Sequence, residues 1–168
     1  TELYKSGAMN EAIRQVLDKK EIIHKIYKEI SGSERAADWY PLNVVCEECG
    51  KLSSTKITAW DGEKVSYTCS SDTIAWAEGC GHEGQISPFD GNATLPWKPE
   101  WAAKFQAKGV HFEGAGKDHY SKGGARQVAE AMRSRAYIWG KCSLVDLCSV
   151  ERNIVFMSRR KDVEMSTS

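Results

Sequence analysis

The stretch Val44-Val45-Cys46-Glu47-Glu48-Cys49-Gly50 decides most about how this chain of 168 residues folds. Two cysteines separated by two residues form one tight turn, and the glycine after them can take a backbone conformation that other residues avoid. Such a turn presents two sulfur atoms from one side, which suits the tetrahedral coordination of zinc. The stretch therefore predicts one half of a metal-binding module.

The residues that follow predict the second half of this module. Residues 55–60 and 64–68 are rich in strand-forming side chains, and Asp61-Gly62 between them is typical of a hairpin turn. Cys69 ends the second of these strands, and the glycine-rich stretch 79–84 supplies a further cysteine and a histidine. A C-x2-C turn, a hairpin and a second group of ligands together predict a zinc ribbon.

Four ligands drawn from this region are expected to hold one structural zinc ion. The candidates are Cys46, Cys49, Cys69, Cys80 and His82. We expect the first two to bind, completed by two of the other three, and a full set of protein ligands closes the site to substrates. The alternative is that these cysteines are buried thiols or disulfides, but nothing indicates secretion. Cys142 and Cys148 have no partner turn and are expected to be buried thiols.

The rest of the chain alternates between helical and strand patterns. An amphipathic helix is predicted over residues 10–30, with Asn10 as its N-cap and Gly32 as its stop, and residues 85–99 resemble a loop. The other predicted elements are a helix at 100–108, a strand at 110–113, a helix at 123–136 and a strand at 153–157. Strand, glycine-rich loop and helix in succession are typical of an α/β nucleotide-binding sheet.

Composition excludes several classes of protein. The content of 41% hydrophobic and 27% charged residues is that of a folded globular chain. No apolar run approaches the ~20 residues that span a bilayer, so no membrane association is expected. The net charge is zero, but residues 47–100 carry nine acids and four lysines, whereas residues 101–141 carry eight basic and three acidic residues. The basic segment is either a solvated face or a site for phosphate or nucleic acid.

Two further stretches of sequence contain residues that could bind a ligand. Residues 112–119, with the sequence FEGAGKDH, follow a predicted strand. Their glycines allow close approach of a ligand, although the pattern is equally that of a solvated turn. Residues 97–101, with the sequence WKPEW, form either a hydrophobic corner or the wall of a ligand pocket, in which Glu100 would pair with a cation.

Together these pieces resemble class I lysyl-tRNA synthetase, the lysine–tRNA ligase of archaea and some bacteria. The resemblance covers residues 1 to about 136, in the order of the family. The matching stretches are ELYKSG at 2–7, WYPLNVVCEECG at 39–50, GCGHEG at 79–84, WKPEW at 97–101 and FEGAGKDH at 112–119.

The resemblance implies an α/β fold in which a zinc-ribbon-containing insertion interrupts a Rossmann-type parallel sheet. Residues 1–42 would be the helical part of the insertion and residues 43–95 its zinc-ribbon module. Residues 96–168 would be the returning second half of the Rossmann domain, with an uncertain tail at 137–168. The remaining half of the synthetase, with its HIGH-type motif, is expected in the full-length protein, and this chain alone is expected to be inactive.

The resemblance also implies a cytoplasmic enzyme that joins lysine to ATP, assisted by magnesium, and transfers lysine to lysine tRNA. Trp97 and His119 would line the lysine pocket. Gly116, Lys117 and Asp118 would lie beside ATP, with His119 and Lys117 in catalytic roles. Residues 164–168 resemble the KMSKS loop, so Met165, Ser166 and Ser168 are candidate ATP ligands, although Glu164 stands where the family has lysine. The alternative is a non-catalytic zinc-ribbon module that binds tRNA.

Overall fold

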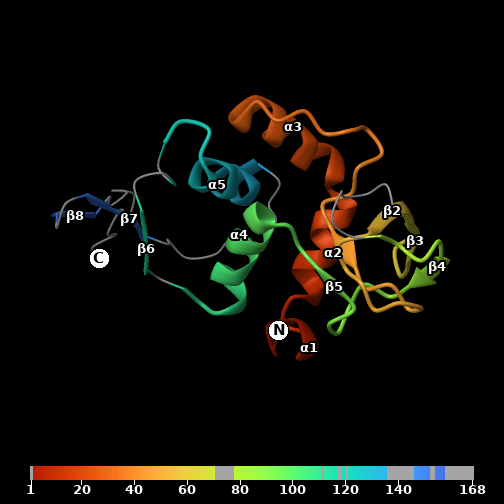
Figure 1. The fold of residues 1–168 in the computed structure, drawn as a ribbon. Helices are drawn as coiled ribbons and strands as arrows, with labels where there is room; N and C mark the ends of the chain where they lie inside the picture. Colours follow the sequence, from red (N-terminus) through yellow and green to blue (C-terminus); the bar gives the residue numbers. More distant parts are fainter. Residues whose placement is uncertain are drawn as a thin grey trace, which may run out of the picture.

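The computed structural model describes residues 2–70, 78–110, 112–116, 119, 121–135, 146–151 and 154–157, without the side chains of residues 112–116, 146–151 and 154–157. The helices are α1 (Glu2–Lys5), α2 (Asn10–Asp18), α3 (Lys20–Ser31), α4 (Trp97–Ala107) and α5 (Ala125–Arg135). The strands are β1 (Asn43–Val44), β2 (Thr55–Trp60), β3 (Val65–Cys69), β4 (Glu83–Ile86), β5 (Ala93–Thr94), β6 (Phe112–Gly116), β7 (Asp146–Glu151) and β8 (Ile154–Met157). In Figure 1 the sheets β2–β4 and β6–β8 lie at opposite ends, with the helices between them.

The single helix predicted over residues 10–30 is wrong, because the chain breaks it into α2 and α3 at Lys19 (φ −110°, ψ 24°). The break lets α2 meet the zinc-ribbon region while α3 packs on α5. Asn10 is not an N-cap either: Met9 takes that position, and the Asn10 side-chain amide donates to Asp90 at 2.8 Å. The predicted stop is confirmed, since Gly32 ends α3 in the left-handed conformation at φ 64°.

The predicted hairpin is confirmed as β2 and β3, to which β4 adds a third antiparallel strand. The Asp61 carboxylate accepts hydrogen bonds from the backbone N–H groups of Glu63 and Lys64, at 2.8 and 2.7 Å, and so closes the turn. The predicted loop at 85–99 is wrong in part. It contains the end of β4, the strand β5 that pairs with β1, and the first residues of α4.

The second half of the described chain is a mixed α/β arrangement. Helix α4 begins at Trp97, three residues before its predicted start, because Pro99 fits the first turn of a helix. Strand β6 begins two residues after its predicted position, and the strand β7 was not predicted. Strands β6 and β7 pair in parallel, and α5 lies between them in the sequence. Strand β8 pairs with β7 in the antiparallel direction. This is one parallel pair, and a Rossmann-type sheet stays a prediction.

One hydrophobic core joins the helices to the sheet β2–β4. It runs from Tyr4 in α1 through Val65 and Tyr67 in β3 to Met132 in α5. The Trp60 indole N–H donates to Asp18 at 2.8 Å and fastens β2 to α2. The three-part division of the chain stays a prediction. Within the described residues, no helix combines the length and apolar character that crossing a membrane requires.

Candidate functional site

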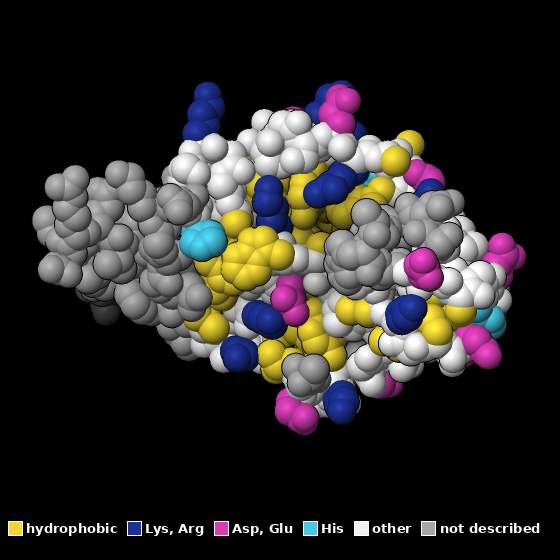
Figure 2. Space-filling view, viewed as in Figure 1, with side chains coloured by type: hydrophobic (Ala, Val, Ile, Leu, Met, Phe, Trp, Pro, Cys, Tyr) yellow, Lys and Arg dark blue, Asp and Glu magenta, His cyan; other side chains and the backbone are white. Residues whose placement is uncertain are grey.

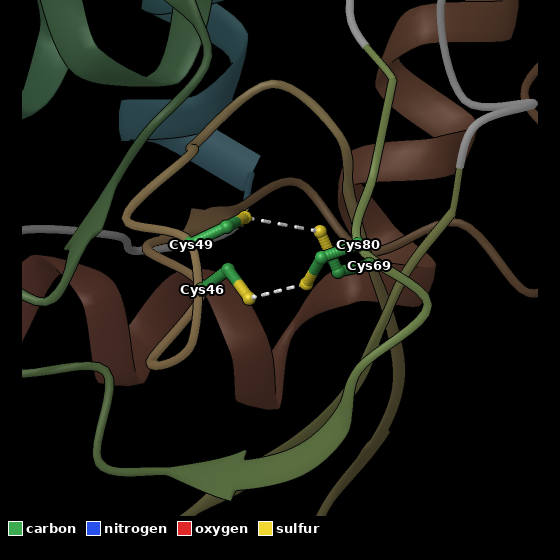
Figure 3. Close-up of side chains that lie close together, drawn as sticks. All are labelled: Cys46, Cys49, Cys69 and Cys80. Atoms are coloured by element: carbon green, nitrogen blue, oxygen red, sulfur yellow. Dashed lines mark hydrogen bonds between the residues drawn. The ribbon is translucent and has the colours of Figure 1, made fainter.

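Four cysteine side chains meet at one end of the sheet β2–β4, where β3 finishes at Cys69. The Sγ atoms of Cys46, Cys49, Cys69 and Cys80 all lie within 4.8 Å of one another. The separation is 3.6 Å between Cys46 and Cys80, and 3.7 Å between Cys49 and Cys69. Figure 3 shows the two cysteines of the C-x2-C turn facing the other two, with the sulfur atoms pointing toward a common centre. The fold thus brings the two sulfurs of the C-x2-C turn to those of Cys69, the last residue of β3, and Cys80, which lies before β4.

The geometry fits a tetrahedral metal. Thiolates at about 2.3 Å from a zinc ion lie about 3.8 Å apart, close to the shorter separations here, whereas a disulfide requires about 2.05 Å. All four cysteines are free, and Cys46 and Cys69 are buried while Cys80 is exposed. His82 is not part of this group of described residues. Its backbone carbonyl accepts from the Cys69 N–H at 2.8 Å, and its ring lies 5.9 Å from that of Tyr67.

Backbone hydrogen bonds shape both turns. In the first, the Cys46 N–H donates to Lys51 and the Gly50 N–H donates to Cys46, both at 2.9 Å. Gly50 has φ 69°, which explains the glycine after the second cysteine. The second turn, residues 78–81 before β4, has no room for a side chain at Gly79, where a Cβ would lie 2.5 Å from the carbonyl oxygen of Cys69. The position therefore excludes any larger residue.

Polar groups favour the thiolate at Cys69 but not at Cys80. A hydrogen bond from the His82 backbone lowers the pKa of Cys80, but burial and hydrogen bonds with the other three cysteines outweigh it and raise that pKa to about 12. The buried Ser54 hydroxyl lies 3.2 Å from the Cys69 Sγ. Burial opposes ionisation of Cys69, but hydrogen bonds from Ser54 and from the backbone of Cys80 outweigh burial and lower its pKa to about 7. The Lys51 ammonium donates to the Glu78 carbonyl at 2.7 Å and ties the two turns together. Because the thiolate is the form that binds metal, the contacts of Cys69 support a metal centre.

A second cluster is aromatic and lies at the start of α4. The Trp97 and Trp101 rings stack with centroids 5.5 Å apart and planes 9° apart. The His119 ring lies 5.9 Å from Trp97 and 5.5 Å from Trp101, and Phe105 lies 5.5 Å from Trp101. Trp101 is buried, whereas Trp97 is 53% exposed. The two residues predicted to line a lysine pocket, Trp97 and His119, are therefore neighbours, with Trp97 open to a ligand.

Helix α1 fixes the position of this cluster. The buried Tyr4 hydroxyl donates to Glu100 and accepts from the Leu95 N–H, both at 3.0 Å. The pKa of Tyr4 is raised well above its usual value, mainly by burial and in part by the nearby Glu100 carboxylate. Glu100 was predicted to pair with a cation. In the structure it forms an ion pair at 3.1 Å with Lys104, one turn further along α4. The N-terminal segment thus aligns the first turn of α4.

The remaining predicted site residues are placed only in part. Gly116 is the last residue of β6, three residues before His119. The others lie outside the described residues: Lys117, Asp118, Met165, Ser166 and Ser168. Of the two remaining cysteines, Cys142 lies outside the described residues, and Cys148 lies in β7, where the side chains are not described. The ATP-binding assignments therefore stay predictions.

Three residues of the two clusters were not among the predicted site residues. Trp101 forms the buried half of the aromatic stack, Ser54 contacts a sulfur, and Tyr4 holds Glu100. The spacing of Trp97 and Trp101, one helical turn apart, was a usable signal for the first. No local pattern marks Ser54 or Tyr4, because their partners are distant in sequence.

Comparison with known proteins adds a family to this geometry. The family described as tRNA synthetases class I (K) matches residues 1–145, which include both clusters. The chain belongs to the class I (K) tRNA synthetase family. The resemblance seen in the sequence is thereby confirmed at the level of the family.

The relatives of this class I (K) chain include archaeal proteins named lysine–tRNA ligase. That of Methanosarcina barkeri is 44% identical over 126 residues, which are 74% of this chain and 22% of the relative. That of Methanococcus maripaludis is 39% identical over 148 residues, covering 82% of this chain and 26% of the relative. The chain thus spans about a quarter of the length of the curated relatives it matches.

Proposed function

We propose that this chain is the part of a cytoplasmic lysine–tRNA ligase that carries the structural zinc and one side of the lysine-binding site. The complete enzyme would join lysine to ATP, with magnesium on the phosphates, and transfer lysine to lysine tRNA. The stack of Trp97 on Trp101 beside His119 carries the proposal. An exposed indole face is a favourable surface for the alkyl stem and ammonium group of lysine.

In this proposal the steps of lysine activation are divided between Trp97 and residues 116–119. Trp97 and His119 contact lysine, while Gly116, Lys117 and Asp118 lie beside ATP. Lys117 supplies positive charge to the phosphates, and the His119 ring donates to a carbonyl or phosphate oxygen. Reactions at phosphates depend mainly on positioning and charge stabilisation, which such groups provide.

The four cysteines would hold zinc in a structural role. Their sulfur-only ligand set and closed coordination leave no position for substrate. The zinc would link the C-x2-C turn to Cys69 at the end of β3 and to Cys80 before β4. The strands β6–β8 would belong to the second half of a Rossmann-type sheet, and the HIGH-type half would complete the nucleotide site.

Transfer of the chain into a complete relative tests this function. In the Methanosarcina barkeri enzyme, the segment that aligns with this chain is replaced by the chain's own residues. We expect lysine-dependent ATP–pyrophosphate exchange to persist in the chimera and to be absent from the isolated chain. A chimera that folds and holds metal but lacks exchange would contradict the proposal, as would exchange by the chain alone.

Two surface variants of the chimera test the lysine site itself. Trp97→Ala removes the exposed ring of the stack and should raise the KM for lysine at least about tenfold. Ile22→Ala is the matched control, since Ile22 and Trp97 are the exposed large hydrophobic residues of the described chain. The control should leave exchange unchanged, and an equal loss in both variants would argue against a lysine contact at Trp97.

A further inference from the structure

Two cations lie over one buried tyrosine ring. The Arg35 Cζ and the Lys98 Nζ each lie 5.3 Å from the centroid of the Tyr27 ring. Arg35 also lies 5.1 Å from the centroid of Trp39, which packs edge-on against Tyr27. Arg35 follows α3, whereas Lys98 belongs to the first turn of α4. The fold therefore brings two positive charges from distant parts of the sequence to one aromatic surface.

Neither cation forms an ion pair with a carboxylate of the described residues. The acids near Arg35 in the sequence pair with other cations: Glu29 with Arg135 at 2.5 Å, Glu34 with Lys28 at 2.6 Å and Asp38 with Lys56 at 2.7 Å. Burial, and then the charge of Arg35, lowers the pKa of Lys98. Two uncompensated like charges at one surface favour an anion between them.

The charged pair adjoins the aromatic cluster of the proposed lysine site. Lys98 follows Trp97 in α4, and Trp97 is 53% exposed. Figure 2 shows Lys and Arg side chains lying over a hollowed hydrophobic area on the same face as an exposed histidine. The two cations, the half-buried Trp39 and the exposed Trp97 therefore lie between the end of α3 and the beginning of α4, over the buried Tyr27.

We propose that Arg35 and Lys98 bind backbone phosphates of a single-stranded RNA end that runs over the Tyr27–Trp39 surface toward Trp97. Sites for single strands combine positive charge along the backbone with aromatic rings on which bases stack. The Arg35 guanidinium offers a planar fork to phosphate oxygens, and Lys98 offers a point charge. A free phosphate uses only the cations, whereas a strand also contacts the half-buried ring of Trp39 beside Arg35.

This inference rests on the proposed function, because the RNA end would be the 3′ end of the tRNA that receives lysine. The two remain separable by experiment. Lysine-dependent ATP–pyrophosphate exchange needs no tRNA, so its loss in the chimera would count against the proposed function. RNA binding by the chain itself needs no catalysis, and the difference between the parent chain and its variants reports on Arg35 and Lys98.

The test measures binding of a labelled single-stranded RNA of about 12 nucleotides, ending in CCA, to the metal-loaded 168-residue chain from about 50 to 200 mM salt. The variants are Arg35→Gln, Lys98→Gln and the double variant. Lys28→Gln is the matched control, because Lys28 lies on α3 and is paired with Glu34. Thermal melting and metal content confirm that each variant is folded.

For the double variant we expect affinity at low salt to fall roughly tenfold or more, and the slope of log affinity against log salt to decrease by about 1.4, which is about 0.7 for each lost phosphate contact. Lys28→Gln should change neither quantity. No binding by the parent chain, an unchanged slope in the double variant, or an equal change in Lys28→Gln would overturn the proposal. Displacement of the RNA by equimolar pyrophosphate would overturn the assignment to a strand.

Discussion

At the residue scale, Gly79 is the position where the metal centre tolerates least change. A Cβ there would lie 2.5 Å from the Cys69 carbonyl oxygen and 2.7 Å from the Ser70 carbonyl carbon, both of them rigid backbone atoms. In Gly79→Ala the turn that carries Cys80 must move away from Cys69. We expect zinc affinity to fall about tenfold or more, as measured by competition with a chelator.

Gly32→Ala is the control for this variant, because Gly32 has φ 64° and nothing within 4 Å of the added Cβ. It should lower the free energy of unfolding by about 1 kcal/mol through strain at the end of α3. Its zinc affinity should match that of the parent chain. Equal zinc affinity in Gly79→Ala would show that the second turn does not position a ligand.

Tyr27 makes stability depend on pH in the alkaline range. Burial raises its pKa to about 12, although Arg35 opposes this shift. A pKa above its unfolded value means that the stabilisation is fully present below pH ~10 and is lost as pH rises toward 12. The loss amounts to about 2.7 kcal/mol for a shift of about two units. Tyr27→Phe should show a smaller loss.

Urea unfolding at pH 8 and near pH 12 measures this difference. The two proteins differ only in the Tyr27 hydroxyl, so comparing their two alkaline losses isolates its contribution. If the parent and Tyr27→Phe lose the same free energy over this range, Tyr27 is not responsible for the alkaline loss.

The ligands themselves show how far the sequence leads at this scale. The C-x2-C spacing predicted a turn with two sulfurs at Cys46 and Cys49. It left Cys69, Cys80 and His82 as alternatives. Cys80 and His82 are only two residues apart, so the sequence alone does not show which of the two side chains points toward the first pair of sulfurs. The structure places the sulfurs of Cys69 and Cys80 beside the first pair. Zinc itself stays a prediction.

At the element scale, the short helix α1 orients α4. The Tyr4 hydroxyl bonds to both Glu100 and the Leu95 N–H, which lie 96 and 91 residues further along the chain. Tyr4→Phe would leave these two groups without their partner, at a cost of about 1–3 kcal/mol. We expect that decrease in the free energy of unfolding, measured with urea.

Tyr40→Phe provides the comparison. The Tyr40 ring is half-buried beneath Lys20, and among described residues its hydroxyl forms no hydrogen bond. Its removal should change stability by less than about 0.5 kcal/mol. Similar losses in both variants would mean that the bonds of Tyr4 do not hold α4.

Element types were easier to predict than their ends. The β2–β3 hairpin followed from two strand-like stretches on either side of Asp61-Gly62, and α5 lies within the helix predicted over residues 123–136. The break at Lys19 was missed because residues on both sides keep a helical period, and only packing against two different partners requires a bend. Strands β1 and β5 have two residues each and are defined by their pairing, which no local pattern reveals.

At the scale of the whole molecule, the metal would hold one end of a shared core. The buried residues run without interruption from α1 through β3 to α5. The α3–α5 contact joins helices from opposite ends of the described chain, and sequence periodicity cannot foresee such pairing. Disturbing the metal site should therefore destabilise more than the sheet β2–β4.

The double variant Cys46→Ser/Cys49→Ser tests this coupling. It removes both sulfurs of the first turn, and metal binding to such modules is coupled to folding. We expect loss of bound zinc together with a large fall in the melting temperature, followed by circular dichroism. Chelator treatment of the parent chain should reproduce the fall, and a variant that stays fully folded without metal would contradict a structural role.

X-ray absorption at the zinc edge, with metal analysis of the purified chain, is the most direct measurement. The four-cysteine site predicts one zinc per chain, with four sulfur neighbours at about 2.3 Å and no nitrogen neighbour. A folded chain without zinc, or a zinc with a nitrogen neighbour from His82, would contradict a metal centre formed by Cys46, Cys49, Cys69 and Cys80.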